Sequence, residues 1–235
     1  MPSFNIIREI DAVDTFRVKS VVGAFDLQTQ KIKEHFQGNI DIEGKDWNVG
    51  LIVGSSGSGK STIAKECFGD FMIDGYEYLS KSVIDDMPKS KSQKDITKAF
   101  TSVGFASPPS WLKPYSVLSN GEKMRCDLAR SILDENEIIC FDEFTSVVNR
   151  EVAKTGSYAI SKSVRKLDKK FIAVSCHYDI KEWLEPDWVY DTDKQEFFFA
   201  QTNLKDLKLS LKFTEQKTLN SIRTNYGKGF ASIII

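Results

Sequence analysis

The sequence lacks long apolar runs and a strong excess of charge of either sign. Its apolar stretches, such as residues 171–174, 197–200 and 233–235, are far shorter than the ~20 residues that a membrane-spanning helix needs. The 32 basic and 33 acidic residues leave a net charge of −1, which neither requires nor excludes a nucleic-acid partner. With no secretion-signal pattern at the N-terminus, we expect a soluble, cytoplasmic protein.

Cysteine and histidine are also scarce, with four and two residues. Cys67, Cys126, Cys140 and Cys176 show no Cys-x-x-Cys spacing, so we expect reduced, mostly buried thiols rather than a disulfide or zinc set. Cys176 and His177 could begin a metal site, but no second pair completes one.

A phosphate loop is the most informative pattern that is present. Residues 48–53 read as a buried strand, and residues 54–62 follow the pattern G-x-x-x-x-G-K-[ST] before a helical segment. Its glycines let backbone N–H groups face phosphate oxygens. Lys60 would place a positive charge on the β- and γ-phosphates, and Ser61 would supply a hydroxyl to Mg²⁺. The alternative is a Gly/Ser-rich linker, but a linker would lack the preceding strand and the following helix. The predicted nucleotide-binding residues are Gly54, Ser55, Ser56, Gly57, Ser58, Gly59, Lys60, Ser61 and Thr62.

The segment before the loop predicts a small antiparallel sheet. Residues 6–16 and 18–27 are rich in β-branched and aromatic residues, and residues 39–42 alternate. Phe25 has two interpretations: a core side chain, or an aromatic ring that stacks on adenine.

The segment after the loop predicts a short helical lobe. A polar connector at 85–92 precedes helical spacing at 93–100, and the prolines of residues 104–114 predict a loop held by its aromatic residues. Ser119 and Glu122 form a capping-box pattern ahead of a helix over 123–133.

Two further strands end in polar residues that suit phosphoryl transfer. Residues 138–141 lead to Asp142, a candidate Mg²⁺ ligand, and to Glu143, a candidate base for the attacking water. The alternative is a pair of solvated turn carboxylates. Residues 171–175 lead to His177, which is either structural or a γ-phosphate contact, while His35 reads as a surface residue.

The C-terminal part predicts a hairpin, at 188–191 and 196–200, that closes the core. Residues 203–235 carry six basic and two acidic residues, a net charge of +4. This extension reads as a solvated tail or as a nucleic-acid contact.

The sequence resembles the ATP-binding cassette (ABC) ATPases in five motifs that occur in the same order. These are the phosphate loop, Leu118–Glu122, residues 138–143, residues 145–149 and His177. The resemblance implies an α/β P-loop fold at 1–202, with a mixed core sheet, an antiparallel β subdomain and a helical lobe at about 84–130. It also implies Mg-ATP hydrolysis in a head-to-tail homodimer, where Ser119 and Gly121 bind the γ-phosphate held by the partner's loop.

Departures from that family lead to three hypotheses about the biological role. The signature ends in Glu122, as in repair and chromosome-type ABC ATPases, Phe144 replaces a usual proline, and Asn149 replaces a usual aspartate. Further segments resemble bacterial and phage ABC ATPases often fused to a GNAT-like acetyltransferase domain. The first hypothesis is an ATPase of DNA metabolism or modification that acts with DNA or with a separate acetyltransferase-like protein. The second is the nucleotide-binding subunit of a membrane transporter, and the third is a slow ATP-dependent interaction switch.

Overall fold

The computed structural model describes residues 2–10, 15–26, 32–73 and 75–199. The chain divides into two compact units, Met1–Phe198 and Phe199–Ile235, and every described helix and strand begins in the first of them. The predicted basic extension lies outside the described residues.

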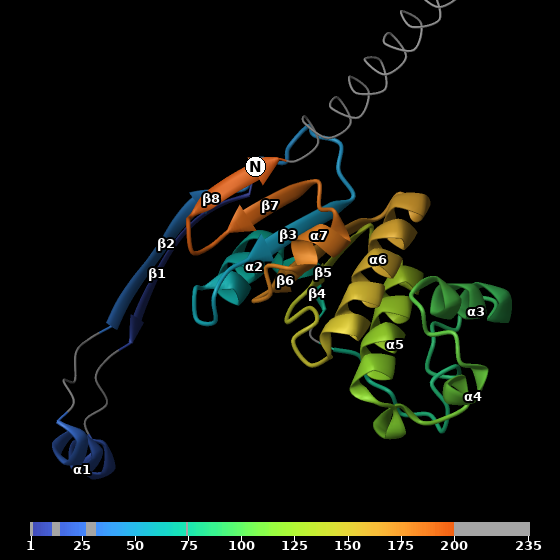
Figure 1. The fold of residues 1–235 in the computed structure, drawn as a ribbon, viewed down its shortest axis with the longest axis horizontal. Helices are drawn as coiled ribbons and strands as arrows, with labels where there is room; N and C mark the ends of the chain where they lie inside the picture. Colours follow the sequence, from blue (N-terminus) through green and yellow to red (C-terminus); the bar gives the residue numbers. More distant parts are fainter. Residues whose placement is uncertain (1, 11–14, 27–31, 74, 200–235) are drawn as a thin grey trace, which may run out of the picture. The chain divides into compact units, whose positions relative to one another are not determined.

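A six-stranded sheet in the order β4-β5-β6-β3-β7-β8 forms the centre of this unit (Figure 1). β3 pairs in parallel with β6 on one side and with β7 on the other, and β5 pairs in parallel with β6 and β4. All five β3 residues are buried, as expected for a strand covered on both faces. The strands are β3 (Val49–Val53), β4 (Met72–Ile73), β5 (Ile138–Phe141), β6 (Lys170–Ser175), β7 (Trp188–Asp191) and β8 (Glu196–Phe199).

Gly50 explains how β3 and β7 fit together. A Cβ atom at this position would lie 2.1 Å from Cζ2 of Trp188, a side chain that is fully buried. The strand therefore needs glycine here to make room for the indole ring.

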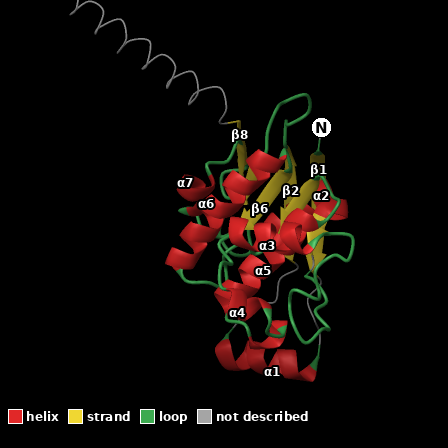
Figure 2. Ribbon diagram, turned by 90° about the vertical axis from the view of Figure 1, so that its right-hand side faces the viewer, coloured by secondary structure: helices red, strands yellow, loops and turns green. Residues whose placement is uncertain are grey.

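The helices that contact the six-stranded sheet include α2 and α6. α6 packs against β3 and β6, and Figure 2 shows helices in front of the strands. No helix among the described residues is long and apolar enough to cross a membrane. The α-helices are α1 (Phe16–Phe25), α2 (Lys60–Phe68), α3 (Gln93–Ser102), α4 (Pro108–Trp111), α5 (Asn120–Leu133), α6 (Arg150–Leu167) and α7 (Ile180–Leu184), with 3₁₀ turns at Gly69–Phe71 and Tyr115–Val117.

The part of the chain predicted to be a helical lobe holds α3, α4 and α5. Its aromatic residues pack as expected, with the ring centroid of Phe100 5.1 Å from Phe105 and 5.4 Å from Trp111. The prediction of an irregular loop is wrong at one point, because Pro108 and Pro109 begin the one-turn helix α4. Proline is tolerated at these first positions because the N–H groups there have no partner within the helix. The lobe boundaries of 84–130 stay a prediction.

The small antiparallel sheet ahead of the loop is confirmed, with different boundaries. β1 (Ser3–Ile10) pairs with β2 (Ile32–Asn39), and Ser3 lies opposite Asn39. The strand predicted over 39–42 is wrong, because β2 ends at Asn39 and the Ile40 N–H donates to the Pro2 carbonyl.

The strand predicted over 18–27 is also wrong, because this segment contains α1. The helix begins at the cap Thr15, whose hydroxyl accepts a hydrogen bond from the Val18 N–H, and ends at Asp26 in the left-handed conformation. These local signals override the strand preference of its β-branched residues.

Candidate nucleotide site

The site lies where three adjacent parallel strands end. The phosphate loop follows β3, Asp142 and Glu143 follow β5, and His177 follows β6 by two residues. Because these neighbouring strands are parallel, the three segments lie together at the carboxyl ends of the strands. This is the usual ligand-binding position in an α/β fold.

Glycines shape the phosphate loop at three points. Gly57 and Gly59 have φ values of 83° and 84°, in the left-handed region that favours glycine. At Gly54 a Cβ atom would lie 2.0 Å from the Thr192 hydroxyl oxygen, so the β7–β8 turn closes against the loop. The loop is also held by a 2.5 Å contact between the hydroxyls of Ser58 and Thr192.

The first turn of α2 presents the binding groups. Gly59 caps this helix without a side-chain hydrogen bond, which leaves backbone N–H groups of the first turn available to an anion. Lys60 is 8% exposed, and its ammonium donates to the Ser55 carbonyl at 2.7 Å. Ser55, Ser56 and Gly57 are exposed, whereas Thr62 is half-buried.

Ser61 and Asp142 meet across the site. The Ser61 hydroxyl donates to Oδ1 of Asp142 at 3.1 Å, although the residues are 81 positions apart. A hydroxyl and a carboxylate are suitable oxygen ligands for Mg²⁺ beside a phosphate. Within the described ranges, no three His, Cys, Asp or Glu side chains group together so that they could hold a metal ion.

Glu143 is exposed and has a left-handed φ of 50°. The next residue, Phe144, is fully buried, and its N–H donates to the Val174 carbonyl at 2.8 Å. Its ring packs edge-on against Phe171. A proline could not donate this hydrogen bond, so the unusual Phe144 anchors the turn that carries Glu143.

His177 is half-buried, and its backbone N–H donates to the Ser175 hydroxyl at 3.2 Å. The ring nitrogen Nδ1 lies 3.8 Å from the Cys176 sulfur. Its role toward a γ-phosphate stays a prediction.

Ser119 and Gly121 are not brought to this site within the chain. The predicted capping box is present: the Ser119 hydroxyl accepts from the Glu122 N–H, and the Glu122 carboxylate accepts from the Ser119 N–H. Hydrogen bonds from the Ser110 hydroxyl and from Ser119 lower the pKa of Glu122 to about 2. Gly121 faces Val152 and Arg125, where a Cβ atom would lie 3.1 Å from Cγ1 of Val152.

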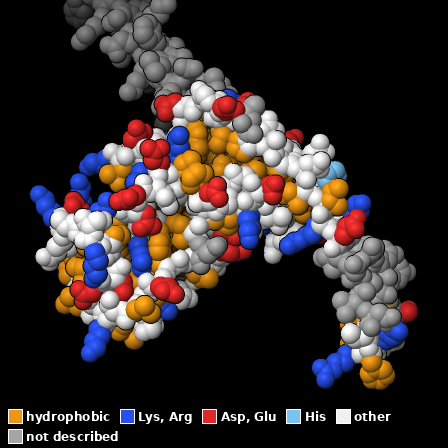
Figure 3. All heavy atoms as spheres, turned by 180° about the vertical axis from the view of Figure 1, so that it is seen from behind, with side chains coloured by type: hydrophobic (Ala, Val, Ile, Leu, Met, Phe, Trp, Pro, Cys, Tyr) orange, Lys and Arg blue, Asp and Glu red, His pale blue; other side chains and the backbone are white. Residues whose placement is uncertain are grey.

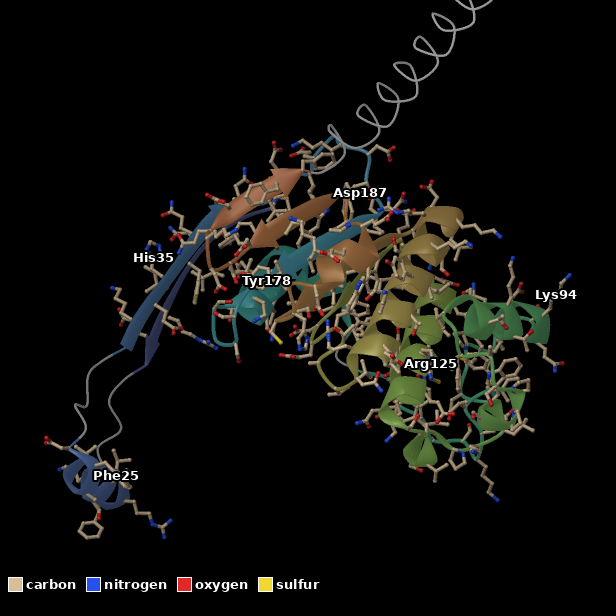
Figure 4. The ribbon with its side chains drawn as sticks, in the orientation of Figure 1. Phe25, His35, Lys94, Arg125, Tyr178 and Asp187 are labelled. Carbon is tan, nitrogen blue, oxygen red and sulfur yellow. The ribbon has the colours of Figure 1, made fainter. Side chains whose placement is uncertain are left out.

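The structure contradicts one of the two interpretations of Phe25, and its stacking on adenine stays a prediction. The side chain is 72% exposed at the end of α1, so the prediction of a core residue is wrong, and the described residues place no other ring against it (Figure 4). The ring that does reach the loop is Phe36 of β2, which lies 2.5 Å from the position of a Cβ at Gly59. We did not predict Phe36 as a site residue, and only its place in a strand before the loop could have indicated it.

The contact between the β7–β8 turn and the phosphate loop was also not predicted from the sequence. The Asp193 carboxylate accepts hydrogen bonds from the Ser55 N–H and hydroxyl, which lower its pKa. Tyr178, labelled in Figure 4, donates to Asp193 and also contacts Asp191, each at 3.0 Å. Burial, together with these carboxylates, raises the pKa of the Tyr178 hydroxyl. The predicted hairpin is therefore confirmed as β7 and β8, but it also supports the loop.

The strand β3, the glycine-rich loop and the helix α2 form a P-loop arrangement at the carboxyl end of an α/β sheet. No protein-family model matches the chain. Among curated proteins it is 25% identical to the alpha-hemolysin translocation ATP-binding protein HlyB of Escherichia coli, over 56% of this chain and 24% of HlyB. The chain thus spans about a quarter of that relative's length.

Solved structures identify the fold more closely. The dimeric bacterial ABC transporter cassette MJ0796 superposes with a TM-score of 0.56 and 13% identity, covering 83% of this chain and 99% of the cassette. A bacterial Atm1-family ABC exporter with ATP bound gives a TM-score of 0.53 at 16% identity, covering 92% of this chain and 42% of the exporter. The chain has the fold of an ABC-type ATP-binding cassette.

Proposed function

We propose that the chain binds Mg-ATP and hydrolyses it. The observation that carries this proposal is the contact between Ser61 and Asp142, because it joins the phosphate loop to the strand end with the two carboxylates. The fold shared with an ATP-bound exporter supports the same activity.

Each residue has a defined part in this chemistry. Lys60 and the first-turn N–H groups of α2 would bind phosphate oxygens, and Ser61 with Asp142 would hold Mg²⁺. The cation would neutralise charge that develops on the phosphates. Glu143, exposed at the edge of the sheet, would orient a water molecule and accept its proton, with His177 beside the terminal phosphate.

Hydrolysis would require two copies of the chain in a head-to-tail homodimer. Ser119 and Gly121 contact Glu122, Val152 and Arg125 rather than the loop of their own chain, among the residues described. A second copy could present them to the nucleotide across a two-fold axis. MJ0796, of the same fold, has been seen as a dimer.

The test is phosphate release by purified protein with ATP and Mg²⁺. Lys60→Ala should abolish turnover, whereas Lys65→Ala, which removes an exposed lysine of the same helix, should leave it unchanged. Wild-type turnover in Lys60→Ala would refute the assignment of the phosphate loop.

For the biological role we propose DNA metabolism or modification, with DNA or an acetyltransferase-like protein as partner. The glutamate that ends the signature and the resemblance to GNAT-fused ATPases support this role. The names of HlyB and MJ0796 favour the second candidate, a nucleotide-binding subunit of a transporter. The third candidate is a slow ATP-dependent interaction switch.

Filter binding to duplex DNA, at low and physiological salt and with and without ATP, tests the first role. We expect ATP-dependent binding that weakens steeply as salt rises, since contacts with phosphates release counterions. Absence of DNA binding together with co-purification of a membrane protein would favour the transporter subunit. Dimerisation with ATP but almost no phosphate release would favour the switch.

A further inference from the structure

A groove of about 930 Å³ lies between α3 and the C-terminal ends of α5 and α6. It is distinct from the nucleotide site. α5 and α6 end at the groove and lead into the starts of β5 and β6, whereas the phosphate loop follows the end of β3. The groove therefore lies near the amino ends of the parallel strands, and the nucleotide site lies at their carboxyl ends.

The floor of the groove is apolar. Ala99, Ile132 and Leu133 line it and are almost fully buried, while Leu167 is 46% exposed at its margin. Its walls are joined by a hydrogen bond of 3.1 Å from the Ser163 hydroxyl on α6 to the Ser102 carbonyl on α3. The groove is thus bounded by helices in direct contact.

The rim of the groove is cationic. Its lining contains five lysines and two aspartates, a formal balance of +3. Lys94 and Lys98 are four positions apart on α3, so they project from the same helix face. Figure 4 labels Lys94, and Figure 3 shows basic side chains standing among hydrophobic ones over the helical part of the chain. The lysines are Lys91, Lys94, Lys98, Lys166 and Lys169.

The carboxylates of the two aspartates accept hydrogen bonds from hydroxyl groups. The Asp95 carboxylate accepts from the Ser92 hydroxyl at 2.6 Å, and the Asp134 carboxylate accepts from the Tyr76 hydroxyl at 2.6 Å. None of the five lysines forms an ion pair within the part of the chain that the structure describes.

Lys169 is half-buried at the margin of the groove. Its ammonium donates to the Asp134 and Asn136 carbonyls. Burial lowers its pKa, and the nearby charge of Lys91 acts in the same direction, although Asp134 opposes both. An added carboxylate nearby would favour the charged form of this ammonium.

We propose that this groove docks an acidic amphipathic helix of a partner protein. Apolar side chains of that helix would cover the floor, and its carboxylates would pair with the rim lysines. A nucleic-acid backbone would satisfy the lysines but leave the apolar floor exposed. The chain's own residues 203–235, with six basic and two acidic residues, have the wrong charge.

The test uses the full chain and a fluorescent helical peptide of about 14 residues with leucines on one face and glutamates beside them. Anisotropy should report binding that weakens as salt rises. Lys94→Glu combined with Lys98→Glu should weaken it about tenfold, and Leu167→Ser, which leaves the rim charges unchanged, should also weaken it. The matched control, Lys154→Glu combined with Lys181→Glu, reverses two exposed lysines outside the groove.

Several results would overturn the proposal. These are no binding of the acidic peptide, equal binding of a peptide with lysines in place of the glutamates, or equal weakening by the control variant. Two others point to different occupants: duplex DNA bound through Lys94 and Lys98 while the peptide is not, or self-association of the chain that the same substitutions abolish. Unchanged ATP turnover in every variant would show that the protein remains folded.

Discussion

The Asp193 carboxylate accepts two hydrogen bonds from Ser55, 2.8 Å from its backbone nitrogen and 2.7 Å from its hydroxyl, across 138 positions of sequence. The turn between β7 and β8 is thereby fastened to the first serine of the phosphate loop. A loop held in this way loses less conformational freedom when it binds phosphate.

Asp193→Ala should therefore raise the KM for ATP by roughly fivefold to tenfold, with a smaller effect on kcat, because one or two hydrogen bonds to a charged group are lost. Steady-state phosphate release measures both constants. Asp193→Asn retains an acceptor and should fall between Asp193→Ala and the wild type. An unchanged KM in both variants would show that the loop keeps its geometry without this carboxylate.

Glu143→Gln should stop hydrolysis and trap a dimer in the presence of Mg-ATP. The amide keeps the shape of the side chain but cannot accept a proton from water. Light scattering with and without ATP measures the change. Adding Lys60→Ala to Glu143→Gln should restore the monomer, whereas a Glu143→Gln variant that stays monomeric at micromolar concentration contradicts the dimer proposal.

Asp142→Asn should lower turnover by at least about a hundredfold and raise the Mg²⁺ concentration needed for half-maximal activity, because a neutral amide binds the cation more weakly. Titration of turnover with Mg²⁺ tests this expectation. Ser61→Ala should shift the titration in the same direction, and Asp70→Asn, an exposed carboxylate, should not. Identical Mg²⁺ curves for Asp142→Asn and the wild type would remove Asp142 from the metal site.

Asp187→Asn should destabilise the fold by about 3 kcal/mol at neutral pH. The buried carboxylate accepts from the N–H groups of Asn48 and Val49 and pairs with Arg165 at 2.9 Å. Burial alone would raise its pKa, but the hydrogen bonds and Arg165 more than offset this effect and lower it.

The direction of the Asp187 pKa shift determines how the destabilisation by Asp187→Asn depends on pH. A lowered pKa means that the stabilisation is present above the unfolded value of about 4 and is lost as the pH falls through the folded pKa. Urea unfolding of Asp187→Asn and the wild type should therefore differ most at neutral pH and converge in acid. A constant difference across this range would assign the effect to packing rather than to charge.

The sequence was sufficient where one local pattern determines the backbone. The β3 strand, the loop glycines and the Ser119–Glu122 capping box each depend on adjacent residues, and all were predicted. The predictions were wrong where local signals compete, as at α1, where β-branched residues suggested a strand but the Thr15 cap begins a helix. Phe36 and Asp193 were missed because their contacts with the loop depend on chain folding over long separations.

The position of α5 has a mechanical consequence. Its N-terminal cap is Ser119, and its last residues, Ile132 and Leu133, line the lysine-rimmed groove. An α-helix of 14 residues is a stiff rod about 20 Å long. A tilt of this helix at the groove would displace Ser119 at its other end. A protein bound in the groove would therefore move the residue that we propose contacts the nucleotide of the second copy.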